Sequence, residues 1–190
     1  MKSIETLVSC LYNCEICSII KRLSNIIYDM STKTIIPTGF SIRRIELSDF
    51  EDVKIVLSGL TTVGPITTTT YEKILNYWNS VKLMTLPDEY AYNTYVIIEN
   101  NINKVAAIGT IFIEQKIIHD GGLVGHIEDI AVNSDYRGQK LGKLIIDYLS
   151  ELGGRLGCYK VILDCDVKNV GFYEKCNYNQ AGIEMQTRFN

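Results

Sequence analysis

The sequence of 190 residues has no excess of positive charge. Its 19 Lys and Arg residues are outnumbered by 22 Asp and Glu residues, which gives a net charge of -3. A protein whose main role is to bind nucleic acid neutralises many phosphates with a basic surface, so this balance argues against a nucleic-acid partner. Any anion that the chain binds must be held by a local group of residues. The hydrophobic content of 46% suits one well-packed domain.

A charge-free apolar run of membrane length is also missing. Residues 1–38 carry apolar side chains near helical spacing, but Glu15, Lys21 and Arg22 interrupt them. We therefore expect an N-terminal extension that is partly helical and makes no stable membrane insertion. It packs on its own domain, contacts a membrane surface or a partner chain, or forms a loose tail. Pro37 and Gly39 mark the boundary with a main domain over residues 39–190.

Histidine is scarce and the cysteines do not form a zinc pattern. Cys10, Cys14 and Cys17 are spaced C-x3-C-x2-C, with neither a neighbouring histidine nor a second matching pair. Structural zinc needs four ligands, so we expect no metal site. The C-x-x-C from Cys14 to Cys17 lacks the preceding strand of a redox motif. With no N-x-[ST] sequon and no signal-peptide pattern, the sequence favours a cytoplasmic protein with free thiols.

From Phe40 onward the sequence alternates between strand and helix patterns. Ser48 with Glu51, and Thr69 with Glu72, form capping boxes that predict helix starts. Two apolar runs around an Asn-rich turn predict a hairpin. The expected strands are 40–47, 90–100, 104–117, 125–132, 159–166 and 182–189, and the expected helices are 48–60, 69–81, about 141–156 and 170–176. This order, βααβββαβαβ, predicts an α/β domain of the α+β type with a mixed sheet.

The segment RGQKLGK, from Arg137 to Lys143, places two glycines and three cations where a helix should begin after a strand. The first N–H groups of a helix have no partners within the helix, and the helix dipole makes that end positive. Glycine lets the backbone approach a ligand closely. The segment therefore predicts a cradle for a phosphate or pyrophosphate, although the pattern alone also fits an ordinary solvated helix start.

Two common phosphate-binding patterns do not fit this segment. Three residues separate Gly138 from Gly142 where the Walker pattern needs four, and Leu144 follows Lys143 in place of Ser or Thr. The chain also has no G-x-G-x-x-G. Hydrolysis of nucleoside triphosphates and dinucleotide binding are therefore disfavoured.

The strand before this segment and the helix after it make it similar to a known motif. The R/Q-x-x-G-x-G/A pattern in this position resembles the pyrophosphate loop of the GNAT N-acetyltransferase superfamily, which holds acetyl-CoA. Arg137 and Gly142 match its outer positions, and Lys140 stands where the general pattern has glycine.

A closer resemblance covers about residues 40–189. The segments LTTVGPIT (60–67), IEQKIIH (113–119), GHIEDIAVNSDYRGQKLGKLIIDYL (125–149), GCYKVILDCDVKNVGFYEKC (157–176) and AGIEMQTRF (181–189) resemble the eukaryotic glucosamine 6-phosphate N-acetyltransferases. The resemblance implies a GNAT fold, acetyl-CoA as co-substrate, and acetyl transfer to the 2-amine of glucosamine 6-phosphate. It also implies a step on the route to UDP-N-acetylglucosamine and a homodimer whose two chains share each substrate site.

The reaction needs a neutral amine, donors for an oxyanion and a proton for the leaving thiolate. The resemblance assigns the thiolate proton to Tyr173, amine orientation to Asp164 with Glu128 as a second contact, and the oxyanion donor to the Ile130 N–H. Water can carry the amine proton away in place of a side chain. We expect direct attack, because Cys165, beside Asp164, lies in no motif for an acetyl-enzyme.

The resemblance also assigns two binding sets. The acetyl-CoA set is Asp129, Ile130, Ala131, Val132, Arg137, Gly138, Gln139, Lys140, Leu141, Gly142, Lys143, Asn169, Tyr173 and Lys175. The sugar-phosphate set is Thr61, Lys116, Ile117, Ile118, His119, Glu128, Asp129, Ile130, Tyr159, Lys160, Asp164 and Arg188.

Two alternatives stay open from the sequence. An acetyltransferase for another amine would usually accept a cationic substrate, which prefers an acidic groove to Lys116, Lys160 and Arg188. An acetyl-CoA-binding module without activity would keep the RGQKLGK loop and would not need Tyr173 or Asp164.

Overall fold

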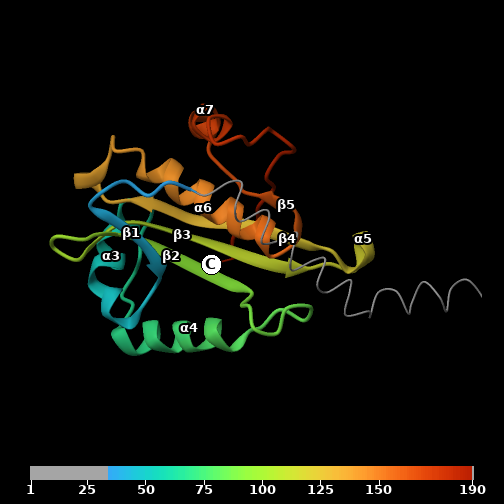
Figure 1. Ribbon diagram of the computed structural model, residues 1–190, viewed down its shortest axis with the longest axis horizontal. Helices are drawn as coiled ribbons and strands as arrows, with labels where there is room; N and C mark the ends of the chain where they lie inside the picture. The colour runs from blue at the N-terminus through green and yellow to red at the C-terminus, as the bar shows by residue number, and fades with distance from the viewer. Residues whose placement is uncertain (1–33, 190) are drawn as a thin grey trace, which may run out of the picture. The chain divides into compact units, whose positions relative to one another are not determined.

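The structure is a computed structural model in which residues 34–189 are described. Its centre is one five-stranded sheet with the strands side by side in chain order (Figure 1). The strands are β1 (Phe40–Arg44), β2 (Tyr92–Glu99), β3 (Lys104–Gln115), β4 (Leu123–Val132) and β5 (Cys158–Ile162). Neighbours from β1 to β4 are antiparallel, and β4 and β5 are parallel. The predicted hairpin is confirmed as β2 and β3, which pair from Tyr92–Phe112 to Glu99–Lys104.

The helical segments lie between the strands in the predicted order. They are η1 (Leu47–Asp49), α3 (Phe50–Ser58), α4 (Thr68–Ser80), α5 (Ile118–Gly121), η2 (Ser134–Tyr136), α6 (Leu141–Arg155), η3 (Val167–Asn169) and α7 (Val170–Glu174). The short segment α5 was not predicted; His119 and Asp120 within it have left-handed backbone angles, with φ of 53° and 55°. The sequence predicts helices, a mixed sheet and their order correctly as far as α7.

Both predicted helix caps are displaced by two or fewer residues. Helix α3 takes Asp49, not Ser48, as its N-cap, because a 3-10 turn precedes it and the Glu46 N–H donates to Asp49 Oδ2 at 2.8 Å. Helix α4 takes Thr67, not Thr69, because the Thr67 hydroxyl accepts the Thr70 N–H at 3.2 Å. Residues 67–70 are all threonine, so the sequence alone does not show which hydroxyl accepts the free N–H group and thereby marks the first residue of the helix.

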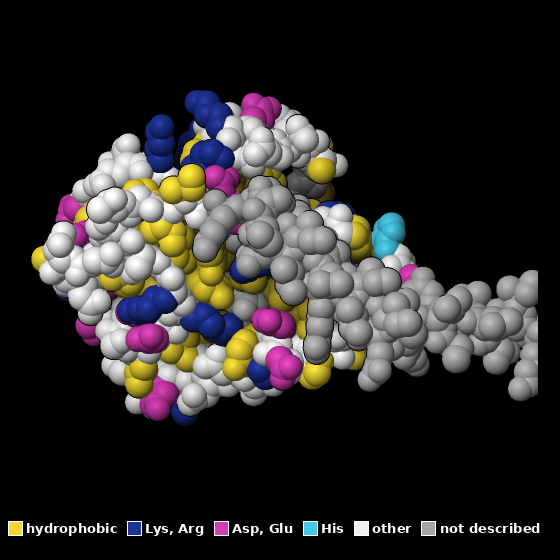
Figure 2. All heavy atoms as spheres, in the orientation of Figure 1, with side chains coloured by type: hydrophobic (Ala, Val, Ile, Leu, Met, Phe, Trp, Pro, Cys, Tyr) yellow, Lys and Arg dark blue, Asp and Glu magenta, His cyan; other side chains and the backbone are white. Residues whose placement is uncertain are grey.

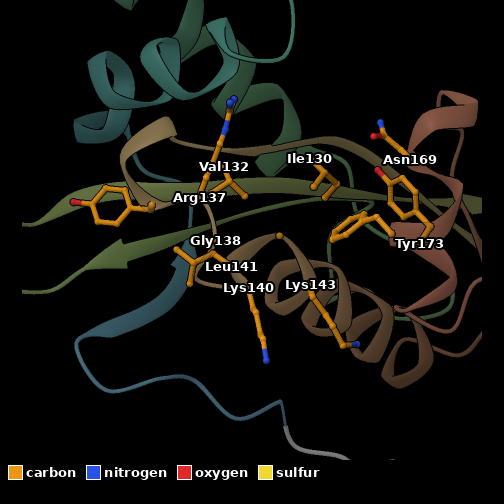
Figure 3. Close-up of a pocket in the computed structure, with 12 residues that line it drawn as sticks. Ile130, Val132, Arg137, Gly138, Lys140, Leu141, Lys143, Asn169 and Tyr173 are labelled. Carbon is orange, nitrogen blue, oxygen red and sulfur yellow. The ribbon is translucent and has the colours of Figure 1, made fainter.

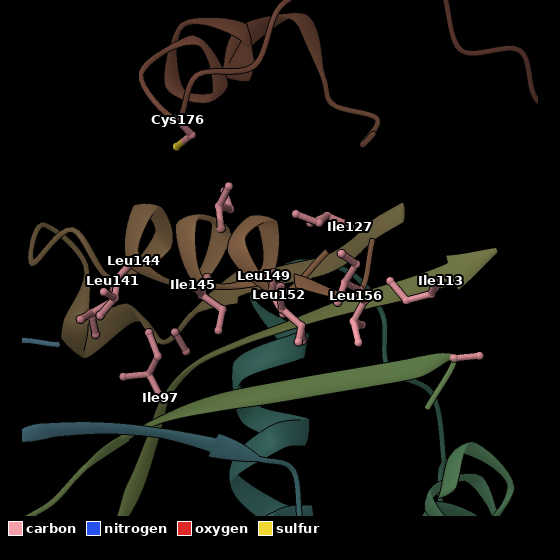
Figure 4. Close-up of a cluster of buried hydrophobic side chains, with 14 of the residues drawn as sticks. Ile97, Ile113, Ile127, Leu141, Leu144, Ile145, Leu149, Leu152, Leu156 and Cys176 are labelled. Carbon is pink, nitrogen blue, oxygen red and sulfur yellow. The ribbon is translucent and has the colours of Figure 1, made fainter. Parts of the chain in front are cut away.

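Helix α6 packs along one face of the sheet, and α3 and α4 pack along the other (Figure 1). The buried residues of α6 gather on one side, as in an amphipathic helix, and pack in one cluster with Ile97, Ile113 and Ile127 of the sheet (Figure 4). A Cβ on Gly109 of β3 would lie 2.5 Å from Ile130 Cδ1 and 2.9 Å from Leu149 Cδ1. Glycine at this position therefore lets α6 and the end of β4 approach the sheet closely.

Strand β4 carries the two irregularities that open a site. Opposite β3 it has one extra residue, since Thr110 pairs with Glu128 while Ile108 pairs with Ala131, and Asp129 in this bulge has a φ of 54°. On its other side the pairing with β5 ends at His126–Ile162. The backbone of β4 beyond His126 therefore runs without a β5 ladder beside it.

The predicted final strand over 182–189 is wrong for the described chain. Residues 179–189 have no assigned helix or strand, and Ile183, Met185 and Phe189 are about nine-tenths exposed. A strand is stable only where its backbone pairs with a neighbour, and the described residues offer this segment no such pairing. Residues 182–189 therefore have the apolar alternation of a strand but pair with no strand of the described sheet.

The predicted N-terminal helix and the cysteine group Cys10, Cys14 and Cys17 lie outside the described residues. Within residues 34–189, no helix is long and apolar enough to cross a membrane. In the same range no three His, Cys, Asp or Glu side chains are grouped as metal ligands. Cys158, Cys165 and Cys176 are free thiols, and burial raises the pKa of Cys158 to about 11.

Candidate active site

A cavity of about 410 Å³ opens where β4 and β5 separate. It is bounded by the end of β4, by the turn that leads into α6 and by the segment of η3 and α7 (Figure 3). Its lining residues are Ile130, Val132, Tyr136, Arg137, Gly138, Lys140, Leu141, Gly142, Lys143, Asn169, Phe172 and Tyr173. The structure thus brings together most of the acetyl-CoA set that the sequence predicts.

The turn before α6 has the geometry of an anion cradle. Gly138 has a φ of 81° and Lys140, the N-cap of α6, has a φ of 62°. Both are left-handed conformations in which glycine is favoured, which explains why the general motif has glycine where this chain has Lys140. Leu141, by contrast, is buried and anchors the turn in the core. The first three residues of this fifteen-residue helix line the cavity, and N–H groups in the first turn of a helix have no partner within the helix.

The three cations of the turn project in different directions. Lys140 and Lys143 project to the same side of α6 in Figure 3, and Lys143 Nζ contacts Asp147 Oδ1 at 2.8 Å, which raises the pKa of the lysine. Arg137 projects the other way, and its guanidinium lies beside Gly59 at the end of α3. Arg137 therefore touches the cavity wall and the loop that follows α3, where Thr61 lies. Figure 2 shows several Lys and Arg side chains together on the rim over α6 and α7.

Tyr173 of α7 is one of the residues that line the cavity. It packs against the core cluster from α7, and Tyr178 and Phe172 lie edge-on to its ring at 6.4 Å and 5.1 Å. Burial is the main cause that raises the pKa of Tyr173 above 10, and the neighbouring Cys165 and Cys176 raise it further. The phenol is therefore protonated at neutral pH and can donate a hydrogen bond to a developing thiolate.

Three carboxyl groups gather beside the bulge of β4. Burial raises the pKa of Glu128, and the charges of Asp129 and Asp164 raise it further, with a smaller contribution from Glu184. His126 opposes this shift. Glu128 and Asp164, which lie far apart in the sequence, are therefore electrostatic neighbours, as two groups that contact one substrate amine must be.

The residues predicted to bind the sugar phosphate lie in several separate parts of the structure of one chain. His119 of α5 and Tyr159 of β5 have ring centroids 4.4 Å apart, and Lys160 Nζ lies 5.9 Å from the Tyr159 ring. Lys116 follows β3 and precedes the exposed Ile117 and Ile118. Thr61 is exposed after α3.

Arg188 belongs to the exposed C-terminal segment, where its Nε donates to Gln186 Oε1 at 3.0 Å. This hydrogen bond is local, so the place of Arg188 in a phosphate site stays a prediction.

Four residues of the predicted acetyl-CoA set are not among those that line the cavity: Asp129, Ala131, Gln139 and Lys175. Ala131 is buried in the second core cluster, so only its backbone is available to a ligand. Two lining residues were not predicted, Tyr136 and Phe172. Each directly precedes a predicted residue, Arg137 or Tyr173, and that adjacency was the only signal in the sequence.

The fold and this cavity define a class of protein. Residues 64–178 match the family model described as the acetyltransferase (GNAT) family. The chain belongs to this family of N-acetyltransferases.

Relatives within the family narrow the comparison. The glucosamine 6-phosphate N-acetyltransferase of Candida albicans is 41% identical over 81% of this chain and 99% of its own length. Glucosamine 6-phosphate N-acetyltransferase 1 of Dictyostelium discoideum is 38% identical over 80% of this chain and 92% of its own. The crystal structure of glucosamine-6-phosphate N-acetyltransferase from Arabidopsis thaliana superposes on this chain with a TM-score of 0.71. The two chains are 36% identical, and the match covers 80% of this chain and 99% of that one.

Proposed function

We propose that the protein is a glucosamine 6-phosphate N-acetyltransferase, which transfers the acetyl group of acetyl-CoA to the 2-amine of D-glucosamine 6-phosphate. The products are N-acetylglucosamine 6-phosphate and CoA, on the route to UDP-N-acetylglucosamine. The observation that carries the proposal is the cavity between β4 and β5, which has an anion-binding helix start at one end and Tyr173 at the other. Glu128 pairs with Thr110 next to the β4 bulge, and Asp164 is its electrostatic neighbour.

The acetyl-CoA contacts follow from this arrangement. The pyrophosphate would lie on the backbone N–H groups from Gly138 to Lys143, with Lys140 adding charge. Because β4 has no β5 ladder beyond His126, the backbone near Ile130 is available to donate to the acetyl oxygen as it becomes an oxyanion. Tyr173 donates to the sulfur as the carbon–sulfur bond breaks.

The amine and its proton are handled at the carboxyl groups. Asp164 and Glu128 accept hydrogen bonds from the amine and hold it toward the carbonyl carbon. The amine nitrogen forms the new carbon–nitrogen bond, its proton leaves through a carboxylate or water, and the thiolate receives the proton of Tyr173 or a hydrogen bond from it.

A homodimer would complete the phosphate site. Lys160 and Asp164 lie four residues apart, which is roughly 13 Å in extended chain and longer than one sugar from amine to phosphate. When the amine of the substrate is held at Asp164, its phosphate can therefore bind Lys160 or Arg188 of a second chain more easily than Lys160 of the same chain. The apolar side chains of the C-terminal segment, Ile183, Met185 and Phe189, would be covered in that dimer.

The free thiols of the described cysteines support a reducing compartment, and we propose that the enzyme acts in the cytoplasm. We also propose that residues 39–190 form the catalytic domain and residues 1–38 an extension outside it. Deleting residues 1–38 is expected to leave turnover intact.

Release of free thiol from acetyl-CoA across a panel of amino sugars tests the proposed function. We expect turnover with glucosamine 6-phosphate and at least a hundredfold lower kcat/KM with glucosamine, since each charge-assisted bond to the phosphate adds affinity. Equal rates with the two sugars would refute the phosphate site and favour another amine as substrate. Binding of acetyl-CoA without thiol release on any amine would instead indicate a binding module.

A further inference from the structure

One oxygen atom of Glu114 contacts both the ammonium group of Lys116 and the imidazole ring of His126. Glu114 Oε2 lies 2.5 Å from Lys116 Nζ and 2.9 Å from His126 Nε2. The three side chains are about one-third exposed, so water reaches the group without separating it. These two hydrogen bonds are the main cause that lowers the pKa of Glu114, which keeps it a carboxylate at neutral pH. Neither Glu114 nor His126 was among the residues predicted from the sequence.

The register of the sheet explains how the group forms. Phe112 of β3 pairs with His126 of β4, and Glu114 lies two residues further along β3 on the same face as Phe112. Lys116 follows the end of β3, past the last pair Gln115–Leu123. Its contact with Glu114 places its ammonium group on the same carboxylate oxygen that His126 contacts.

His126 connects this group of side chains to the proposed amine contact Glu128. His126 and Glu128 are two residues apart on one strand, so they share a face at a separation of roughly 6.6 Å. A hexosamine 6-phosphate carries its amine and its phosphate at opposite ends of one ring, so groups two strand residues apart can contact the two ends of one molecule. A sugar whose amine is bound at Glu128 can therefore extend its phosphate toward the Lys116 ammonium group, which shares Glu114 Oε2 with His126. An ammonium group has three donors, and Glu114 uses one, which leaves two for phosphate oxygens.

We propose that Glu114 is a positioning residue for the sugar phosphate, which aligns the Lys116 ammonium group of its own chain and, with it, the His126 ring. This inference rests on the proposed function, since it takes the phosphorylated amino sugar as the substrate. It adds a residue that does not touch the reacting atoms, and it places the His126 ring beside Lys116 at the phosphate end of the site.

The variant Glu114→Gln tests the inference by a split between kinetic constants. The amide keeps the shape but cannot accept from two cations at full strength, so Lys116 is released toward solvent. We expect the KM for glucosamine 6-phosphate to rise about tenfold, with the KM for acetyl-CoA and kcat within about twofold of the parent. Glu114→Asp, which keeps the charge, should recover part of the loss. An unchanged KM for the sugar, or an equal rise in both KM values, would overturn the proposal.

A double-mutant cycle with Lys116→Ala separates positioning from a general loss of charge. If Glu114 acts through Lys116, adding Glu114→Gln to Lys116→Ala should change the sugar KM less than about twofold. A further tenfold rise in that background would show that Glu114 acts independently and would overturn the proposal. The heat of binding of glucosamine 6-phosphate gives the same comparison without turnover.

The matched control is Glu51→Gln, which removes the carboxylate from another lysine pair, Lys54–Glu51 at 3.0 Å on the exposed side of α3. It should leave all three constants unchanged. If the parent chain releases no thiol with glucosamine 6-phosphate, the proposed function fails. If the parent is active and Glu114→Gln has the parental KM for the sugar, only the present inference fails.

Discussion

At the scale of single residues, the site depends on side chains whose ionisation is set by burial and by near neighbours. Packing against the core raises the pKa of Tyr173, and burial together with the charges of Asp129 and Asp164 raises the pKa of Glu128. A protonated phenol suits an acetyl transfer, which needs a proton donor at sulfur. The packing that stabilises the fold therefore also sets the chemistry.

Tyr173→Phe removes the donor and keeps the ring. We expect kcat to fall about a hundredfold, the typical contribution of one general acid, with little change in the KM for acetyl-CoA. Steady-state thiol release measures both constants. A variant with the parental kcat would show that sulfur leaves without help from Tyr173.

Glu128→Gln tests the raised pKa through stability. A carboxyl group whose pKa is higher in the folded chain than in the unfolded chain favours folding below its unfolded value, near 4.5, and this contribution is lost as the pH rises through the folded value. The amide has no such dependence. We therefore expect Glu128→Gln to unfold at higher urea concentration than the parent at pH 7, with the gain shrinking by pH 4. A constant difference across this pH range would contradict the assigned shift.

Lys140 occupies a left-handed backbone position at the start of α6, so Lys140→Gly should remove steric strain. We expect the free energy of unfolding to rise by about 0.5–1 kcal/mol, because the relief exceeds the added entropy of the unfolded chain. The KM for acetyl-CoA should rise, because a cation is lost from the cradle. Lys140→Ala is the matched control: it loses the same charge and keeps the strain, so it should show the weaker binding without the gain in stability.

At the scale of elements, the close packing over Gly109 involves both a core residue of α6 and a residue of the site. Gly109 lets Ile130, at the β4 bulge, and Leu149 of α6 meet over β3. Ile130 also lines the cavity, so the packing over Gly109 and the cavity wall share this side chain. Element packing and site geometry are therefore coupled at one backbone position.

Gly109→Ala would place a methyl group 2.5 Å from Ile130 Cδ1. We expect a loss of about 1–3 kcal/mol in unfolding free energy from overpacking, together with reduced kcat as Ile130 is displaced. Chemical denaturation and thiol release measure the two effects. Gly182→Ala, where no atom lies within 4 Å, is the control and should match the parent in stability.

The sequence predicts helices, strands and turns well where the pattern depends on residues close together in the chain. Strand alternation, the hairpin and the RGQKLGK turn all depend on residues near one another in the chain, and each appears as expected. The Glu114–His126 contact joins residues twelve positions apart across two strands, and no local pattern encodes it. The final strand was predicted from an alternation that is present, but the pairing it needs comes from tertiary or quaternary structure. Phe172 and Tyr136 were missed because apolar wall residues carry no distinctive chemistry.

At the scale of the whole molecule, an acidic chain concentrates its cations at a few places. The cradle before α6, the group at Glu114 and the Tyr159–Lys160 pair all lie at the ends of strands or helices, whereas the middle of the sheet is buried between two apolar clusters. An anionic cofactor and an anionic sugar can thus be bound without a basic surface. The described chain leaves its C-terminal apolar segment uncovered.

Deleting residues 182–190 tests the proposed dimer. We expect the full chain, of 21.5 kDa, to sediment as a dimer and the shortened chain as a monomer with a higher KM for the sugar. Analytical ultracentrifugation and thiol release give these two results. A full chain that sediments as a monomer at assay concentration and still acetylates glucosamine 6-phosphate would rule out a shared site.

A row of aromatic rings crosses the sheet and ends at His126. Trp78 of α4 stacks on Tyr92 with 11° between the rings, Tyr92 lies 4.9 Å from Phe112, and Phe112 lies 6.1 Å from the His126 ring. Trp78 is the only tryptophan of the sequence. All of the indole fluorescence of the native chain therefore originates at one end of this row, whose other end is the imidazole that we propose lies beside the phosphate. We therefore expect arrival of the sugar to change the intrinsic fluorescence of Trp78, which can be recorded without a dye or a label.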